Sequence, residues 1–379
     1  MKFQLKPLKL PLFVLGVVLV IFSPYIFWIL QPTKDLSVLI LDKTVPTANY
    51  REHKGLMWIL NHFKYVQNPE KMPFVYSRDY AGFFPLGDNR YIINPIPTEP
   101  RDYDLIYIAD TYGVYSEDFY PAEESANHPP MIYGGLQADE VRIIKKKLKP
   151  GTTLIAEFNT FASPTKAAER DTMTEILGLK WSGWTGRHYD DLTRGREVSD
   201  RIIENYEAQT DIEWPYNTPG VLFLHQDGGV AVLAEEHDIR PTGLHVVFPA
   251  DSADNYGVKT AVPYLYWFDI VSPSTGTQVI ANYRFDLTPS GKNVLDKADI
   301  PEEFPAILKS RKSDYTAYYF AGDFADFNTI PERWKWRWSE FYHRWSLVDP
   351  EVEGTAFYWK VYVPLMRTIL LETSLWVTE

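Results

Sequence analysis

The stretch from Thr152 to Ser163 reads TTLIAEFNTFAS and decides the fold that we predict for this chain. Its first half is an apolar run typical of a buried strand, and the run breaks at a turn before a helix that begins near Pro164. Open α/β sheets bind their ligands at such turns, beyond the carboxyl ends of the strands. The turn carries Glu157 and Asn159 where a nucleophile-elbow enzyme carries Ser or Cys.

Two earlier segments have the same character as this strand. Leu36 to Asp42 reads LSVLILD, and Asp104 to Asp110 reads DLIYIAD. Helical periodicity follows each of the three strands, and alternating strands and helices predict a mostly parallel sheet with helices on both faces. The helices are expected at Glu52 to Val66, Gln137 to Leu148 and Pro164 to Leu177.

The second half of the chain has a different pattern. A loop rich in glycine and aromatic residues is expected at Leu179 to Leu192, and mostly strands after it. We therefore expect an α/β domain over residues 36–235 and a β-rich extension with aromatic C-terminal helices over residues 236–379, packed on the same body because no linker-like stretch separates them. The expected strands are Gly220 to Glu235 as a hairpin, His245 to Pro249, Tyr264 to Val271, Gln278 to Leu287 and Tyr315 to Phe320.

The N-terminus combines a basic tail with a long apolar run. Residues 1–9 contain three lysines, and residues 10–30 carry no charge. A run of this length crosses the hydrocarbon layer as a helix, at roughly 1.5 Å per residue over about 30 Å. It predicts a transmembrane signal anchor. The lysines place the N-terminus in the cytoplasm and the body outside, as in a single-pass plasma-membrane protein.

Composition excludes several classes of function. A net charge of −12 over 379 residues argues against nucleic acid as a partner, because phosphate binding needs a clustered basic face. The absence of cysteine excludes disulfides, thiolate metal sites and a cysteine nucleophile. Walker, dinucleotide-binding, zinc-peptidase and serine-hydrolase motifs are missing from the sequence.

Three acidic residues close the three predicted parallel strands, and they are the catalytic candidates. They are Asp42, Asp110 and Glu157. If the strands are neighbours, the carboxylates meet at one edge of the sheet. There they could bind a divalent cation, exchange a proton as a general acid and base, or hold sugar hydroxyls. Alternatively, they cap the loops and helices that follow the strands. No other cofactor is predicted.

A second group of candidate ligand-binding residues lies in the loop at Leu179 to Leu192. Here His188 is followed closely by Asp190 and Asp191, and Trp184 precedes it. Histidine beside carboxylates can act as an oriented base or as a metal ligand. A hydrogen-bonded structural histidine is the other interpretation.

A third group is the pair Asp323 and Asp326 in the segment GDFAD. Carboxylates beside aromatic rings are typical of carbohydrate sites, where the rings stack on sugar faces and the acids bind hydroxyls or catalyse glycosyl transfer. The chain has 12 Trp and 25 Tyr, so aromatic residues are abundant. A solvated turn would also explain the pair.

The order of LSVLILD, helix, DLIYIADTYG, helix and TLIAEFNTF resembles the class I glutamine-amidotransferase-like fold, a flavodoxin-like sheet, over Leu36 to Glu235. The runs LDKTVP, HKGLMWILNH and YYFAGDFAD are similar to those of membrane-anchored proteins of Gram-positive bacteria. Amidotransferases carry a cysteine at the turn where this chain has Glu157 to Thr160. The resemblance therefore implies a repurposed pocket without cysteine-dependent activity.

These observations predict a membrane-anchored extracytoplasmic protein whose pocket binds a glycan, or a similar polyhydroxylated ligand, in cell-envelope or exopolysaccharide metabolism. One alternative is a carboxylate-dependent hydrolase acting on glycans, with Asp110 and Glu157 as the acid and base. Another is a scaffold for a membrane-protein partner, which would use the anchor and the Trp-rich segment at residues 331–345. The expected partners are the membrane, a glycan and an envelope glycosyltransferase or transport protein.

Overall fold

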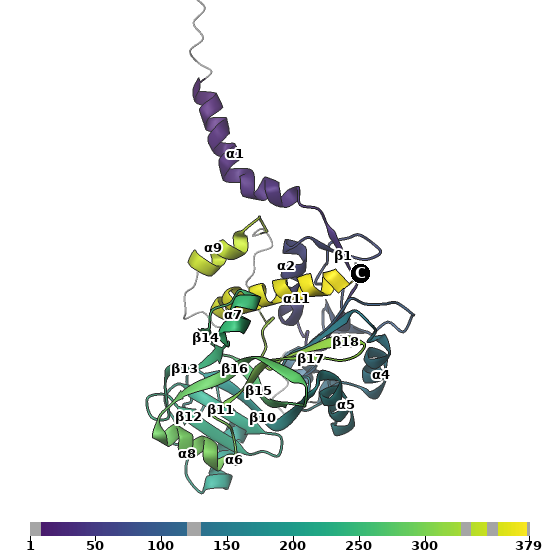
Figure 1. Ribbon diagram of the computed structural model, residues 1–379. Helices are drawn as coiled ribbons and strands as arrows, with labels where there is room; N and C mark the ends of the chain where they lie inside the picture. The colour runs from purple at the N-terminus through teal and green to yellow at the C-terminus, as the bar shows by residue number, and fades with distance from the viewer. Residues whose placement is uncertain (1–8, 120–129, 327–334, 347–354, 377–379) are drawn as a thin grey trace, which may run out of the picture.

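The computed structural model describes residues 9–119, 130–326, 335–346 and 355–376. A ten-stranded sheet forms the centre of this part of the chain, and a four-stranded sheet and two two-stranded sheets accompany it. Figure 1 shows helix α1 (Lys9–Ile29) projecting from the body, while the C-terminal helix α11 (Val363–Trp376) lies across it.

The ten-stranded sheet has the order β14-β13-β16-β17-β18-β9-β6-β2-β4-β5. The strands from β18 to β4 pair in parallel. The pairings on either side of them are antiparallel. The parallel strands are β2 (Val38–Asp42), β4 (Ala81–Gly87), β6 (Leu105–Asp110), β9 (Thr152–Ala156) and β18 (Tyr315–Phe320). The antiparallel strands are β5 (Arg90–Asn94), β13 (Ile239–Val247), β14 (Ala261–Pro263), β16 (Thr277–Leu287) and β17 (Glu303–Arg311).

The sheet is therefore mixed, and the prediction of a mostly parallel, flavodoxin-like sheet was wrong. The reason lies in the second half of the chain, where β16, β17 and β18 follow one another as antiparallel neighbours. β18 then pairs in parallel with β9, so strands from residues 236–379 continue the sheet of the first half.

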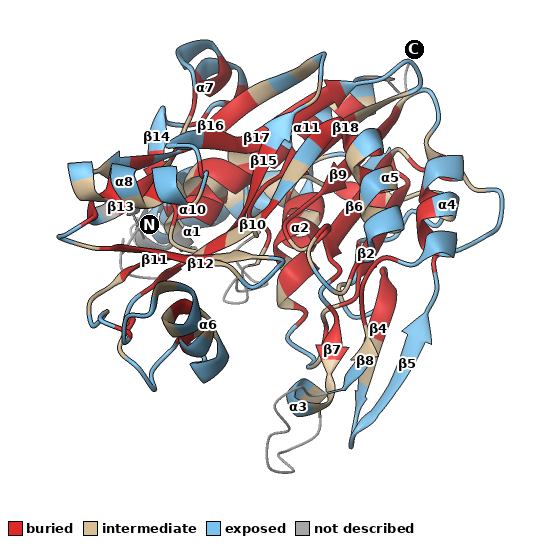
Figure 2. Cartoon of the chain, turned by 90° about the horizontal axis from the view of Figure 1, so that it is seen from below, coloured by how far each residue is buried: buried red, intermediate tan, exposed pale blue. Residues whose placement is uncertain are grey.

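Helices cover the central strands, which explains why those strands are apolar along their whole length. Every residue of β2, β6 and β9 is buried, as expected for parallel strands covered on both faces. Figure 2 shows α4 and α5 with exposed outer faces beside these buried strands. The helices that follow the three strands are α2 (Arg51–His62), α4 (Ala138–Lys147) and α5 (Ala167–Leu177).

The C-terminal segment is a core element. It consists of α10 (Thr355–Phe357), a π-helical turn η1 (Tyr358–Tyr362) and α11. The hydroxyl of Tyr362 lies 2.6 Å from that of Tyr107 in β6, and the hydroxyl of Thr373 lies 2.8 Å from that of Thr153 in β9. The segment thus packs directly on the parallel strands.

The four-stranded sheet has the order β12-β11-β10-β15. Its strand β10 (Leu179–Tyr189) replaces the loop expected there. The other strands are β11 (Gly220–His225), β12 (Val230–Ala234) and β15 (Trp267–Pro273). The remaining short strands are β1 (Lys34–Leu36), β3 (Tyr65–Gln67), β7 (Val114–Tyr115) and β8 (Met131–Tyr133). The remaining helices are α3 (Ser116–Phe119), α6 (Asp200–Thr210), α7 (Ala250–Tyr256), α8 (Pro289–Lys297) and α9 (Ser339–Ser346).

The N-terminal prediction is corrected by the helices that the structure describes. Within residues 9–119, 130–326, 335–346 and 355–376, no helix has both the length and the apolar character needed to cross a membrane. The predicted transmembrane signal anchor at residues 10–30 and the single-pass plasma-membrane location were therefore wrong. Most of the predicted basic tail, residues 1–8, and residues 331–334 of the Trp-rich segment lie outside the described residues.

Candidate functional site

Four acidic residues lie at or just beyond the carboxyl ends of four neighbouring parallel strands. β18, β9, β6 and β2 are successive neighbours in the sheet. Asp42 ends β2, Asp110 ends β6, and Glu157 directly follows β9. Asp323 stands three residues beyond β18. The sheet order thus adds Asp323 to the edge where the sequence predicted the first three carboxylates.

Asp110 is held by three hydrogen bonds. Its Oδ1 accepts from the Thr44 hydroxyl and from the backbone N–H of Tyr112, both at 2.6 Å. Its Oδ2 accepts from the side-chain amide of Asn159 at 3.0 Å. Burial raises the pKa of Asp110 to about 6, although the hydrogen bonds from Asn159, Thr44 and Tyr112 oppose the shift. Asp110 therefore changes its charge close to neutral pH.

Asp42 is engaged in a buried network. Its Oδ2 lies 2.5 Å from Nδ1 of His53, and its Oδ1 accepts from the backbone N–H of Thr44 at 3.0 Å. The other ring nitrogen of His53 lies 2.8 Å from the carbonyl oxygen of Tyr76. Asp42 and His53 have fully buried side chains. This pair supports the loop that carries Thr44, and it does not line the cavity described below.

Glu157 is also fully buried. Its Oε1 accepts from the hydroxyl of Tyr107. Its Oε2 accepts from the backbone N–H groups of Phe324 and Ala325, each at 3.1 Å. Burial raises the pKa of Glu157 to about 8. Glu157 thus ties the end of β9 to the turn after β18.

A cavity of about 400 Å³ opens beside Asp110 and Asp323, and we call it the acid pocket. The rings of Phe158 and Trp267 lie 5.8 Å apart and nearly parallel in its wall. The cavity combines carboxyl groups, a guanidinium, an amide and aromatic rings. Its lining includes Arg51, Asp110, Asn159, Tyr266, Trp267 and Asp323.

A cluster of three carboxyl groups adjoins this pocket. One carboxylate oxygen from each of Glu52, Asp323 and Asp326 lies within 4.8 Å of the other two. Nε of Arg51 lies 2.7 Å from Oε1 of Glu52, and the hydroxyl of Tyr266 donates to Oδ2 of Asp326 at 2.8 Å. Oxygen donors in this arrangement suit a hard divalent cation. We call these three residues the carboxylate cluster.

Glu52 was missed by the sequence analysis, although it is 1% exposed. It stands in the first turn of α2, where an acidic residue normally complements the positive end of the helix dipole in solvent. Burial, and after it the negative charges of Asp326 and Asp323, raises the pKa of Glu52 well above its usual range. The only local signal was Gly55, a residue that permits close packing of the helix.

The structure separates the second predicted group from the acid pocket. His188 lies in β10, with Nε2 at 3.1 Å from Oε1 of Glu235 and Nδ1 at 3.7 Å from Oδ1 of Asp190. Asp191 accepts from the backbone N–H of Thr193 at 2.8 Å. The Trp184 ring packs 4.9 Å from the ring of His225. None of His188, Asp190, Asp191 and Trp184 lines the acid pocket.

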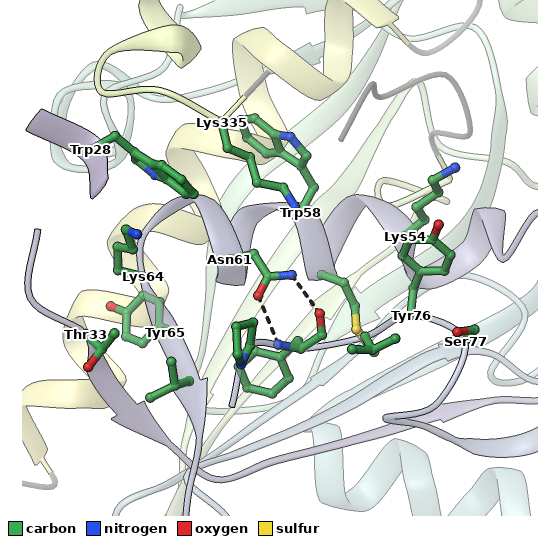
Figure 3. Close-up of a pocket in the computed structure, with 15 residues that line it drawn as sticks. Trp28, Thr33, Lys54, Trp58, Asn61, Lys64, Tyr65, Tyr76, Ser77 and Lys335 are labelled. Atoms are coloured by element: carbon green, nitrogen blue, oxygen red, sulfur yellow. Dashed lines mark hydrogen bonds between the residues drawn. The ribbon is translucent and has the colours of Figure 1, made fainter. Parts of the chain in front are cut away.

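A second cavity of about 510 Å³ lies between α1 and α2. Figure 3 shows lysine side chains and aromatic rings around it, including Trp28, Trp58 and Lys64. The side chain of Asn61 is bonded in both directions to the backbone of Phe74, at 2.8 Å and 2.9 Å. No carboxyl group of a described residue lines this cavity. The acid pocket, and not this second cavity, is therefore the candidate site for carboxylate chemistry.

Comparisons with known proteins provide no family for the chain. No family profile matches it, and no curated protein matches it. Among solved structures, the carbohydrate deacetylase Agd3 is 10% identical, with a TM-score of 0.32 over 76% of this chain and 30% of that protein. A β-galactosidase from Rahnella sp. R3 is 11% identical, with a TM-score of 0.34 over 94% and 34%. The exo-β-1,4-mannosidase Op5Man5 from an Opitutaceae bacterium is 12% identical, with a TM-score of 0.32 over 83% and 37%.

The chain thus spans about a third of the length of each of these three proteins. At such low TM-scores the similarity carries no argument about activity. The prediction of a flavodoxin-like, glutamine-amidotransferase-like sheet was wrong, since parallel and antiparallel strands share one ten-stranded sheet.

Proposed function

We propose that the acid pocket is the active site of a carboxylate-dependent hydrolase that acts on a glycan. The observation that carries this proposal is the position of Asp110. Its carboxyl group lies in the wall of a cavity of about 400 Å³ that also contains Asp323. A volume of this size falls within the range of about 300–1,000 Å³ that is usual for small-molecule sites.

Asp110 is suited to act as the general base. A base works best when its pKa lies near the working pH, because it is then both ionised and able to accept a proton. The pKa of about 6 meets this condition at neutral pH. The hydrogen bonds from Thr44 and Asn159 hold the carboxylate in one orientation, so a water molecule beside it would lose its proton in a fixed direction.

Asp323, rather than Glu157, supplies the second carboxyl group of the pocket. Glu157 directs its oxygens to Tyr107 and to two backbone amides, whereas Asp323 lines the cavity. The backbone N–H of Asp323 donates to the Tyr264 hydroxyl at 2.9 Å. The pocket therefore holds two carboxyl groups that come from different strand ends.

The other walls of the pocket suit a sugar. Aromatic rings present flat apolar faces on which sugar rings stack. The partly exposed ring of Trp267 could supply such a face, and the buried Phe158 packs nearly parallel to it. Arg51 and Asn159 add hydrogen-bond donors for hydroxyl oxygens. These features support a polyhydroxylated substrate over an apolar one.

A glycan screen tests the proposal. The full chain would be incubated with neutral and acetylated oligosaccharides, and the release of reducing ends and of acetate would be measured. We expect product from at least one glycan and none above background with Asp110→Asn. Binding without product would assign a glycan-binding role instead, and the absence of both would overturn the proposal.

A further inference from the structure

We propose that the carboxylate cluster of Glu52, Asp323 and Asp326 is a binding site for one hard divalent cation. The three residues come from two distant parts of the chain: Glu52 from the first turn of α2, and the two aspartates from the turn after β18. Their closest oxygens lie within 4.8 Å of one another. Three carboxylates can offer between three and six oxygen ligands, and Mg²⁺, Mn²⁺ and Ca²⁺ prefer oxygen.

The local charge is unbalanced without a cation. Arg51 contacts two members of the cluster, with Nε at 2.7 Å from Oε1 of Glu52 and Nη1 at 3.7 Å from Oδ2 of Asp326. Among the residues that the structure describes, one guanidinium contacts this cluster, and three ionised carboxylates against it leave two negative charges, which one divalent cation would neutralise. Uncompensated charges are costly to bury, so a cation bound among these carboxylates would stabilise them.

A second, independent observation points to a missing ligand. Oε2 of Glu52 is buried and has no hydrogen-bond partner among the described residues. The Glu52 side chain is 1% exposed, so solvent does not satisfy this oxygen. Buried polar atoms without a partner are rare in folded proteins and call for an explanation such as a bound ion. Since Arg51 occupies Oε1, Oε2 is the oxygen left to coordinate a cation.

The two sides of the site are rigidly held. Glu157 binds the backbone N–H groups of Phe324 and Ala325, which lie between the two aspartates. Gly55, one turn after Glu52, lies so close to this segment that a Cβ atom there would be 2.5 Å from the carbonyl oxygen of Ala325. The helix and the turn are therefore fixed against each other before a cation binds.

This inference deepens the proposed function, and the chemical role of the cation depends on that function. Asp323 belongs both to the carboxylate cluster and to the lining of the acid pocket. A cation bound to it would lie beside the pocket and would supply a Lewis acid that polarises a substrate oxygen or a bound water. Asp110, outside the cluster, would remain the base.

Cation binding can be measured without any assay of activity. The full chain would be treated with EDTA, freed of it by gel filtration, and titrated with MnCl₂ while free Mn²⁺ is followed by electron paramagnetic resonance. We expect one saturable site per chain. Glu52→Gln should weaken the affinity at least tenfold, because it replaces the available oxygen donor with an amide. Thermal unfolding without metal checks that the variant is folded.

The matched control is Glu302→Gln. Glu302 is a half-exposed surface residue paired with Lys292, and its substitution should leave Mn²⁺ affinity unchanged. If Glu52→Gln does not fold, Asp326→Asn serves the same comparison. The absence of saturable Mn²⁺ binding by the wild type, or equal affinity of the cluster variant and the control, would overturn the inference.

The two proposals can fail separately. Mn²⁺ binding without glycan hydrolysis would leave the cation site standing and remove the proposed function. Hydrolysis that persists in EDTA, in a chain that binds no Mn²⁺, would remove the cation site and keep the hydrolase.

Discussion

Oε2 of Glu157 accepts a hydrogen bond from the backbone N–H of Phe324 at 3.1 Å. This contact joins the ends of two parallel strands whose residues are far apart in the sequence, and the neighbouring N–H of Ala325 makes the same bond. Because Asp323 and Asp326 flank these two residues, Glu157 sets the shape of the turn that carries them. Glu157 is therefore a positioning residue for the acid pocket.

Two substitutions of Glu157 distinguish the stability that comes from its hydrogen-bond acceptors from any effect of its charge. Glu157→Ala leaves two buried N–H groups without an acceptor, and each such loss costs about 1–3 kcal/mol. Glu157→Gln keeps an acceptor for these groups and should cost less than half as much. Urea denaturation measures both free energies of unfolding. If Glu157→Ala is as stable as the wild type, or if the two variants are equally destabilised, this interpretation is incorrect.

Asp269 should make the free energy of unfolding fall as the pH rises through neutrality. It is fully buried, it accepts from Tyr319 and from Nε1 of Trp181, and burial raises its pKa to about 7. The folded state therefore binds the proton more tightly than the unfolded state. Its contribution is complete below about pH 4 and is lost as the pH rises through about 7.

Asp269→Asn removes this titration, so the free energy of unfolding of the variant should depend less on pH between about 4 and 7 than that of the wild type. The difference corresponds to roughly 4 kcal/mol at most, at about 1.4 kcal/mol per pKa unit. Urea denaturation at several pH values gives both curves. Parallel curves for the two proteins would show that Asp269 titrates normally in the folded state.

Breaking the buried ion pair of Lys43 and Glu140 should lower the free energy of unfolding far more than breaking a surface pair. The Lys43 side chain is fully buried, and its Nζ lies 2.8 Å from Oε2 of Glu140. Lys43→Met leaves a buried carboxylate without its partner, a change that costs about 3–5 kcal/mol. The double variant Lys43→Met with Glu140→Gln should recover part of the loss.

The control for this pair is Lys292→Met, which breaks the exposed pair with Glu302. Such pairs contribute about 1 kcal/mol or less. Chemical denaturation gives the free energy of unfolding of Lys43→Met, of the double variant and of Lys292→Met. Equal losses for Lys43→Met and Lys292→Met would contradict the assignment of a buried, stabilising pair.

The sequence predicted the part of the site that depends on local pattern. The apolar runs ending at Asp42 and Asp110 form neighbouring parallel strands, and the register places these two residues opposite each other. Strands that are buried on both faces are apolar throughout, so their ends are visible in the sequence. The acidic residue at each end could therefore be assigned to one edge of the sheet.

The other part of the site depends on long-range pairing that no local pattern encodes. β18 lies beside β9, although about 160 residues separate them in the chain, and this pairing brings Asp323 to the edge. Glu52 could not be found because its first-turn position is typical of a solvated acid. In the folded chain it is buried, and the same helix packs closely against Ala325 at Gly55.

β10 shows a third limit of sequence patterns. Its glycines predicted a loop, but Gly186 lies against the ring of Phe268, where a Cβ atom would be 2.3 Å from the ring. Glycine at this position makes room for a neighbouring aromatic ring in a strand, which is one of its known uses. Composition alone does not distinguish this use from a turn.

The most direct test of the acid pocket as a hydrolytic site compares kcat/KM of the wild type with that of two matched variants on a glycan identified by the screen. Asp110→Asn removes the proposed base, whereas Asp190→Asn makes the same substitution at a carboxylate that is 78% exposed and outside the pocket. We predict that Asp110→Asn lowers kcat/KM by about 100-fold or more, while Asp190→Asn stays within about twofold of the wild type. Equal activity of Asp110→Asn and the wild type would contradict the account.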